Sequence, residues 1–236
     1  MASGVYWARW FITCTLLIVL SIVLMATAEA NHTDTNAGFL YQEATPELNA
    51  VDYFETGSAH HENGEYEAAI ADFNRAIELD SSFADAYAGR GKAYVELENY
   101  TLAITDYDKA IELDANSAES HNLRGELYRF IEKYEQALLD YDRAIELDPV
   151  NAEAYTNRGI VFDILGDYEQ ALVELNRAIE LDPEYIRAYN NRSITYLNLE
   201  DYDRARADAD RAIELDPTYP RAYYSRGNLS FALGEY

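Results

Sequence analysis

The stretch Ala-Ile-Glu-Leu-Asp at residues 76–80 occurs five times in this chain, and each copy begins 34 residues after the one before. The copies begin at Ala76, Ala110, Ala144, Ala178 and Ala212. A strict period of this length indicates a stack of similar supersecondary units, each burying its apolar side against its neighbours. The period therefore predicts the architecture before any single helix is assigned.

Counting back from each copy divides the chain into five complete units and one partial unit. They span residues 50–83, 84–117, 118–151, 152–185, 186–219 and 220–236. The eighth position holds Gly57, Gly91, Gly125, Gly159, Ser193 and Gly227, and the twentieth holds Ala69, Ala103, Ala137, Ala171 and Ala205. On each side of a turn at the sixteenth position, apolar residues recur every three or four residues, which predicts two amphipathic helices per unit.

This pattern resembles the tetratricopeptide repeat family, whose units have an aromatic residue at position four, Gly at eight, Ala at twenty, an aromatic at twenty-four and Ala at twenty-seven. The resemblance covers residues 50–236. It implies an all-α fold, a right-handed α-solenoid of stacked antiparallel helix pairs. Glycine in a helix costs about 0.5–1 kcal/mol, so we expect the glycine at eight to permit close contact with the alanine at twenty.

The seventh position departs from the family pattern, which usually has leucine there. It holds Arg90, Arg124, Arg158, Arg192 and Arg226, whereas the first unit, with no unit before it, has Thr56. We infer that each arginine reaches back to a carboxylate at position 23 or 29 of the preceding unit, such as Asp72 or Glu78 for Arg90. The alternative is that these arginines face a partner.

The first 28 residues are typical of an export signal, since Arg9 is their only charged residue and an apolar stretch runs from Trp10 to Met25. We predict either a signal peptide cleaved after Ala28 or a retained anchor, because residues 10–28 are just long enough to span a bilayer. Residues 29–49 are polar and are expected to form a linker. Both alternatives place the repeats outside the cytoplasm, secreted, periplasmic or anchored to the membrane, as in exported bacterial members of the family.

Composition excludes several classes of function. Acidic residues outnumber basic ones 43 to 18, a net charge of −25, which argues against binding nucleic acid through a basic surface. The single cysteine, Cys14, rules out a disulfide framework or a site made of several cysteines. His60 and His61 are adjacent and would point apart on a helix. We therefore expect no catalytic residues, no metal and no cofactor.

In the resembled family, the first helices of successive units line a concave groove. The late part of that groove is predicted to be rich in amides and arginines, which suit hydrogen bonding to a peptide backbone or a carboxylate. The candidate peptide-binding residues are Asn122, Asn157, Arg187, Asn190, Asn191, Arg221, Tyr224 and Asn228. The family's clamp for chaperone tails is not matched, because Phe54, Ser58, Thr156 and Ile160 occupy its key positions.

The sequence thus predicts a non-catalytic scaffold that binds protein or peptide segments of unknown identity. An alternative is the regulatory or docking arm of an enzyme or assembly complex whose catalytic part is lost or on another chain. A third is an acidic protein that binds cations at its surface. The partial unit 220–236 could cap the array, pair with another copy, or be a piece of a longer array; we expect a monomer.

Overall fold

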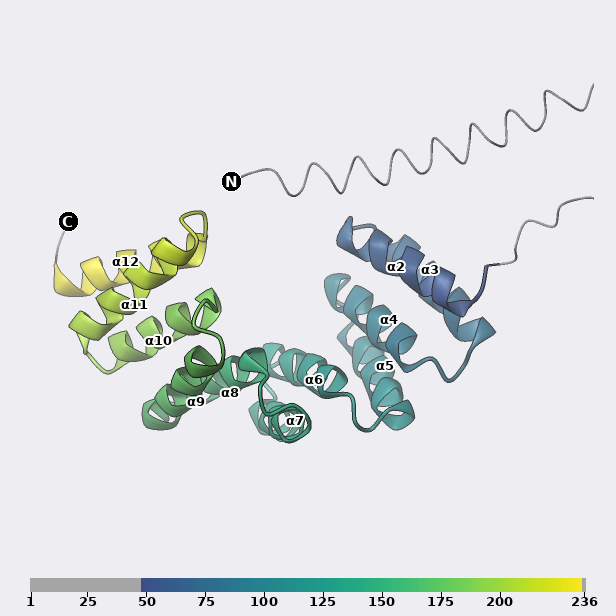
Figure 1. The fold of residues 1–236 in the computed structure, drawn as a ribbon, viewed down its shortest axis with the longest axis horizontal. Coiled ribbons are helices and arrows are strands. Elements are labelled where there is room, and N and C mark those ends of the chain that lie inside the picture. Colours follow the sequence, from purple (N-terminus) through teal and green to yellow (C-terminus); the bar gives the residue numbers. More distant parts are fainter. Residues whose placement is uncertain (1–47, 235–236) are drawn as a thin grey trace, which may run out of the picture. The chain divides into compact units, whose positions relative to one another are not determined.

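The computed structural model describes residues 48–234, and within this range the chain forms eleven α-helices and no strand. In Figure 1 the helix pairs follow one another along an arc. The first helices of the units are α2 (Ala50–Glu62), α4 (Ala84–Glu96), α6 (Ala118–Phe130), α8 (Ala152–Ile164), α10 (Ile186–Asn198) and α12 (Pro220–Leu233). The second helices are α3 (Tyr66–Leu79), α5 (Tyr100–Leu113), α7 (Tyr134–Leu147), α9 (Tyr168–Leu181) and α11 (Tyr202–Leu215). The predicted all-α solenoid is confirmed.

The turn between the two helices of each pair contains a residue in the left-handed region. The fifteenth position of the unit has φ of 60–81° at Gly64, Glu98, Glu132, Gly166, Glu200 and Gly234. This conformation ends the first helix, and the next helix begins two residues later in each complete unit. Glycine adopts it freely, whereas a glutamate there is strained by its Cβ.

The helices of one unit pack through the glycine at position eight. A Cβ added to Gly91 would lie 2.7 Å from the ring of Tyr107, and one added to Gly125 would lie 2.8 Å from the ring of Tyr141. Both tyrosines stand at position twenty-four of their units and are buried. The alanines at position twenty are 0% exposed, but the side chain nearest each of these glycines is the ring at twenty-four. The glycine therefore makes room for a large residue at position twenty-four as well as for the alanine, since a Cβ at Gly57 would also lie 3.2 Å from the carbonyl oxygen of Ala69.

The arginines at position seven join three helices. Arg124 donates through Nε and Nη2 to the two carboxylate oxygens of Asp140 at 2.9 and 2.7 Å, and through Nη1 to Asp108 at 2.6 Å. Asp140 is at position 23 of the same unit, and Asp108 is at position 25 of the preceding unit. Arg90, Arg158 and Arg192 make the same two-sided contacts. Each arginine thus ties its own helix pair to the previous pair.

This geometry corrects the predicted partners. The arginine does reach the preceding unit, but at position 25, where Arg90 donates to Asn74 at 2.5 Å. Its bidentate carboxylate, Asp106, comes from its own unit because the second helix folds back beside the first. In the first unit, where Thr56 replaces the arginine, Asp72 instead contacts His60 Nδ1 at 2.7 Å.

The predictions for residues 1–28 and for most of the linker, 29–47, lie outside the described residues. Within residues 48–234, no helix is both long enough and apolar enough to cross a bilayer. The same range contains no group of three or more His, Cys, Asp or Glu side chains arranged to hold a metal ion.

Candidate functional site: the inner face of the first helices

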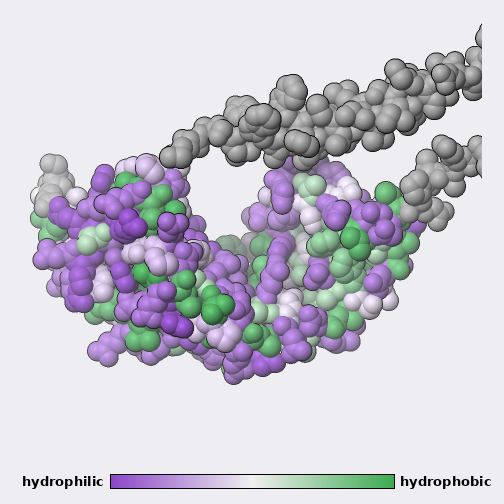
Figure 2. All heavy atoms as spheres, in the orientation of Figure 1, coloured by the Kyte–Doolittle hydropathy of each residue, from purple (hydrophilic) through white to green (hydrophobic). Residues whose placement is uncertain are grey.

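The first helices line the inner side of the array. Each contacts the first helix of the next unit, from α2 against α4 to α10 against α12, whereas no two second helices within residues 48–234 contact each other. Elements on the inner side of a curve are closer together than those on the outer side. In Figure 1, α6 accordingly lies inside the arc and α7 outside it. Figure 2 shows that hydrophilic side chains dominate the visible face, with hydrophobic ones scattered among them.

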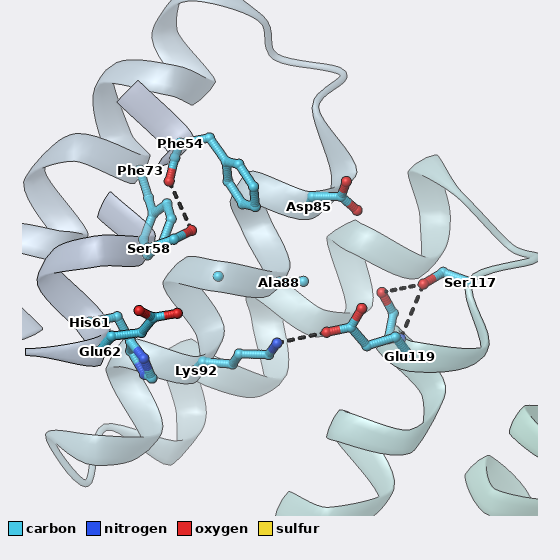
Figure 3. Close-up of a pocket in the computed structure, with 12 residues that line it drawn as sticks. Phe54, Ser58, His61, Glu62, Phe73, Asp85, Ala88, Lys92, Ser117 and Glu119 are labelled. Atoms are coloured by element: carbon cyan, nitrogen blue, oxygen red, sulfur yellow. Dashed lines mark hydrogen bonds and ion pairs between the residues drawn. The ribbon is translucent and has the colours of Figure 1, made fainter. Parts of the chain in front are cut away.

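A pocket of about 320 Å³ opens on this face between α2, α4 and α6 (Figure 3). Phe54 and Phe73 form an apolar wall, with ring centroids 5.8 Å apart. Gly89 lies against Phe73, and a Cβ there would be 2.8 Å from the ring. The rim is charged, because Lys92 Nζ donates to Glu119 Oε1 at 2.6 Å across α4 and α6. An apolar recess with a charged rim suits one side chain of an extended peptide.

The centre of the inner face holds a polar network between α6, α8 and α10. Asn157 is 0% exposed, and its Nδ2 donates to Asn122 at 3.1 Å and to Glu126 at 3.2 Å. Arg187 donates to the side-chain oxygen Oδ1 of Asn157 at 3.1 Å and to Glu153 at 2.9 Å. The network joins three successive first helices, so these side chains bind one another.

The candidate peptide-binding residues therefore separate into two groups. Asn190 is buried and accepts a hydrogen bond from Ser225, and Asn191 donates to the backbone of its own helix. Asn122, Asn157, Arg187 and Asn190 stabilise the stack, because each hydrogen-bonds to a side chain of a neighbouring first helix. The second group is exposed on α12 and consists of Arg221, Tyr224 and Asn228.

The network sets the electrostatics of the central face. Burial raises the pKa of Glu126, and the charge of Glu153 raises it further, while Arg187 and Arg129 oppose the rise. Burial also raises the pKa of the Tyr185 hydroxyl to about 12. The central face therefore keeps an acidic side chain in a partly desolvated position, held by Asn157 and Arg187.

Family models match most of the described array. A model described as TPR repeat matches residues 57–98, 91–129 and 131–163, and models described as tetratricopeptide repeat match residues 152–185 and 186–219. The chain belongs to the tetratricopeptide repeat family. Members of this family are typically interaction modules, which agrees with the coarse prediction of a scaffold.

Solved tetratricopeptide repeat proteins share this fold. YrrB, described as a TPR protein with an unusual peptide-binding site, is 29% identical, with a TM-score of 0.57 over 76% of this chain and 92% of its own. MamA is 26% identical, with a TM-score of 0.59 over 71% of this chain and 92% of its own. PilW, a type IV pilus biogenesis factor, is 19% identical, with a TM-score of 0.73 over 79% and 86% of the two chains. No curated protein is significantly similar to the chain.

Sequence reasoning missed the pocket walls of this tetratricopeptide repeat array. Phe54 and Phe73 come from different helices, and Ala88 and Gly89 complete the recess from the next unit. The available signal was the small pair Ala88-Gly89 at positions five and six, where the later units have larger residues. Small residues facing an aromatic pair predict a recess only when the relative position of the two units is known.

Proposed function

We propose that this protein is a non-catalytic scaffold that binds an extended peptide segment of a partner protein along the inner face of its first helices. The observation that carries the proposal is the recess between α2, α4 and α6, which has an apolar wall of Phe54 and Phe73 and a charged rim (Figure 3). The peptide-binding site named for YrrB, at 29% identity, supports the same use of the fold.

The distribution of side chains along the first helices favours an extended peptide over a small molecule as the ligand. The recess is open to solvent, and its rim carries Asp85, Glu62 and the Lys92–Glu119 pair. The exposed side chains of Phe130, Ile164 and Tyr224 lie farther along the first helices, on α6, α8 and α12. A ligand that contacts several of these positions must extend across successive units, as a peptide backbone does.

We also propose that the array works outside the cytoplasm. The basis is the basic start and apolar stretch of residues 1–28 described above. A fusion of the full chain to alkaline phosphatase, which is active only after export, should be active in bacterial cells. A matched fusion lacking residues 1–28 should be inactive; equal activity of the two would contradict export.

Two lysines in similar ion pairs offer a matched test of peptide binding. Lys92 pairs with Glu119 on the inner face, and Lys109 pairs with Glu112 on α5; the lysine side chains are 38% and 36% exposed. A random peptide library displayed on phage would be selected on the full chain. Lys92→Glu should reduce capture of the selected peptides, because it adds a negative charge at the rim, and Lys109→Glu should leave capture unchanged. No enrichment, or equal effects of the two variants, would overturn the proposal.

A further inference from the structure

Arg129 on α6 differs from almost every other arginine of the described array, because its side chain has no carboxylate partner. Within residues 48–234 it makes no ion pair within 4 Å of a carboxylate, and its Nε is buried without an acceptor. The side chain is nevertheless half-buried on the inner face. In a protein with 43 acidic residues and 18 basic ones, a partly desolvated guanidinium that forms no ion pair requires an explanation.

A second buried polar group lies beside it. Tyr141 is 0% exposed, and burial raises the pKa of its hydroxyl, while the charge of Arg129 and a side-chain hydrogen bond with it oppose the rise. Because the hydroxyl is enclosed, Arg129 is the group of this pair that remains for a ligand.

An apolar pocket of about 190 Å³ adjoins Arg129 between α4 and α6. Val95, Leu123 and Leu127 line it, and the ring of Phe130 stands at its edge with 62% of its surface exposed. The site therefore offers a cation next to a recess that fits an aliphatic side chain.

The neighbouring acid does not satisfy Arg129. Glu126 lies one helical turn before it, but its carboxylate accepts from Asn157 at 3.2 Å and lies 3.7 Å from Arg187 Nη2. Burial raises the pKa of the Tyr107 hydroxyl at the other side of the pocket, and the charges of Glu126, Asp106, Glu96 and Glu119 raise it further. Among the residues that line the pocket, Arg129 is the one cation and therefore the group that would attract an incoming acid.

We propose that Arg129 binds an Asp or Glu side chain of the peptide, and that an adjacent apolar side chain of the same peptide enters the pocket between α4 and α6. This inference rests on the proposed function and names the ligand chemistry of the inner face. The net charge of −25 taken alone would instead favour a basic ligand. The inner face continues on both sides of the pocket, toward α2 and toward α8, so the acid belongs to the interior of a segment.

The test selects random decapeptides, displayed with both ends joined to the carrier protein, on the full chain. The best peptide is then synthesised in its acidic form and with the acid changed to its amide. Both forms are titrated by fluorescence anisotropy against the wild type, Arg129→Met and Arg143→Met. Arg143 is the control, since it lies in the same unit on α7 and is exposed in its pair with Glu146. Circular dichroism verifies that each variant is folded.

We expect the selected peptides to have an acid beside an aliphatic residue. Loss of the acid should weaken binding to the wild type and to Arg143→Met about tenfold, and should not weaken binding to Arg129→Met. Selection without an acidic preference, or an equal loss on all three proteins, would overturn this inference and leave the proposed function standing. An acid that acts only as a free C-terminus, tested with a matched terminal peptide, would overturn the interior placement. Absence of any selected peptide would overturn both proposals.

Discussion

Replacing Arg158 with methionine should destabilise the array, because it leaves the buried carboxylate of Glu174 without its cation. Arg158 donates to Glu174 from Nε at 3.1 Å and from Nη2 at 2.6 Å, and from Nη1 to Asp142 at 2.7 Å. The Arg158 and Glu174 side chains are 18% and 5% exposed. After the substitution, Glu174 keeps only the hydrogen bond from Gln170 at 2.8 Å.

Breaking one side of a buried ion pair costs about 3–5 kcal/mol, and the lower end applies here because one edge of the arginine reaches solvent. We therefore expect a loss of about 3 kcal/mol, which corresponds to a fall of roughly 6–12 °C in Tm for an array of this size. Urea and thermal denaturation followed by circular dichroism would measure it. Arg158→Met with Glu174→Leu should recover most of the loss, since the pair is then replaced by apolar side chains.

Arg177→Met is the matched control. Arg177 pairs with Glu180 on α9, and both side chains are largely exposed, at 46% and 66%. Solvent screens such a pair, so the control should be close to wild type. If Arg158→Met were no less stable than Arg177→Met but bound no peptide, the arginines at position seven would be partner contacts and not links between units.

Three further predictions test the packing and the charge of the array. Gly125→Ala should destabilise by about 1–3 kcal/mol, because the added Cβ would lie 2.8 Å from the Tyr141 ring; Gly227→Ala has open space and should stabilise by about 0.5–1 kcal/mol. Equal shifts of the two urea midpoints would contradict this packing. Glu132→Gly should raise Tm, because φ at this residue is 62°; a lower Tm would refute strain at this turn. Glu126→Gln should stabilise the protein near neutral pH, since burial raises the pKa of Glu126 and the folded state favours its protonated form. The contribution of Glu126 to wild-type stability is therefore complete below the ordinary glutamate pKa and is lost as pH rises through the raised pKa of the folded state. The urea midpoints of wild type and variant should diverge with rising pH. A difference that stays constant with pH would contradict the raised pKa.

The arginines at position seven show how much of the packing could be predicted from the sequence. Thr56 in the first unit and arginine in every later unit correctly indicated a contact with the preceding unit. The residues contacted, Asp140 and Asp108 for Arg124, could not be read from the period. Positions 23 and 25 are two residues apart and point to nearly opposite sides of the second helix, and the rotation of that helix decides which of them faces which unit.

Whether the candidate residues bind a peptide stays a prediction, but the structure shows which of them are covered. Positions five and six were expected to face a groove, but Asn122 and Asn157 bind each other across a helix contact. Whether an amide at such a position is open or covered depends on how closely two first helices approach. That distance is set by side chains from several units at once, and it left Arg129 without an ion pair while enclosing Asn157.

The sequence by itself determined the repeat length, the two helices of each unit, the turns between them and the burial of the small residues at positions eight and twenty. These features follow from local periodicity, which every unit repeats and which needs no knowledge of its neighbours. Only the tertiary structure decided which carboxylates pair with the arginines, which amides are covered and where the inner face remains open. Those outcomes depend on the rotation and separation of neighbouring helices. Moving one helix by a few ångströms is enough to make or break a hydrogen bond between two side chains.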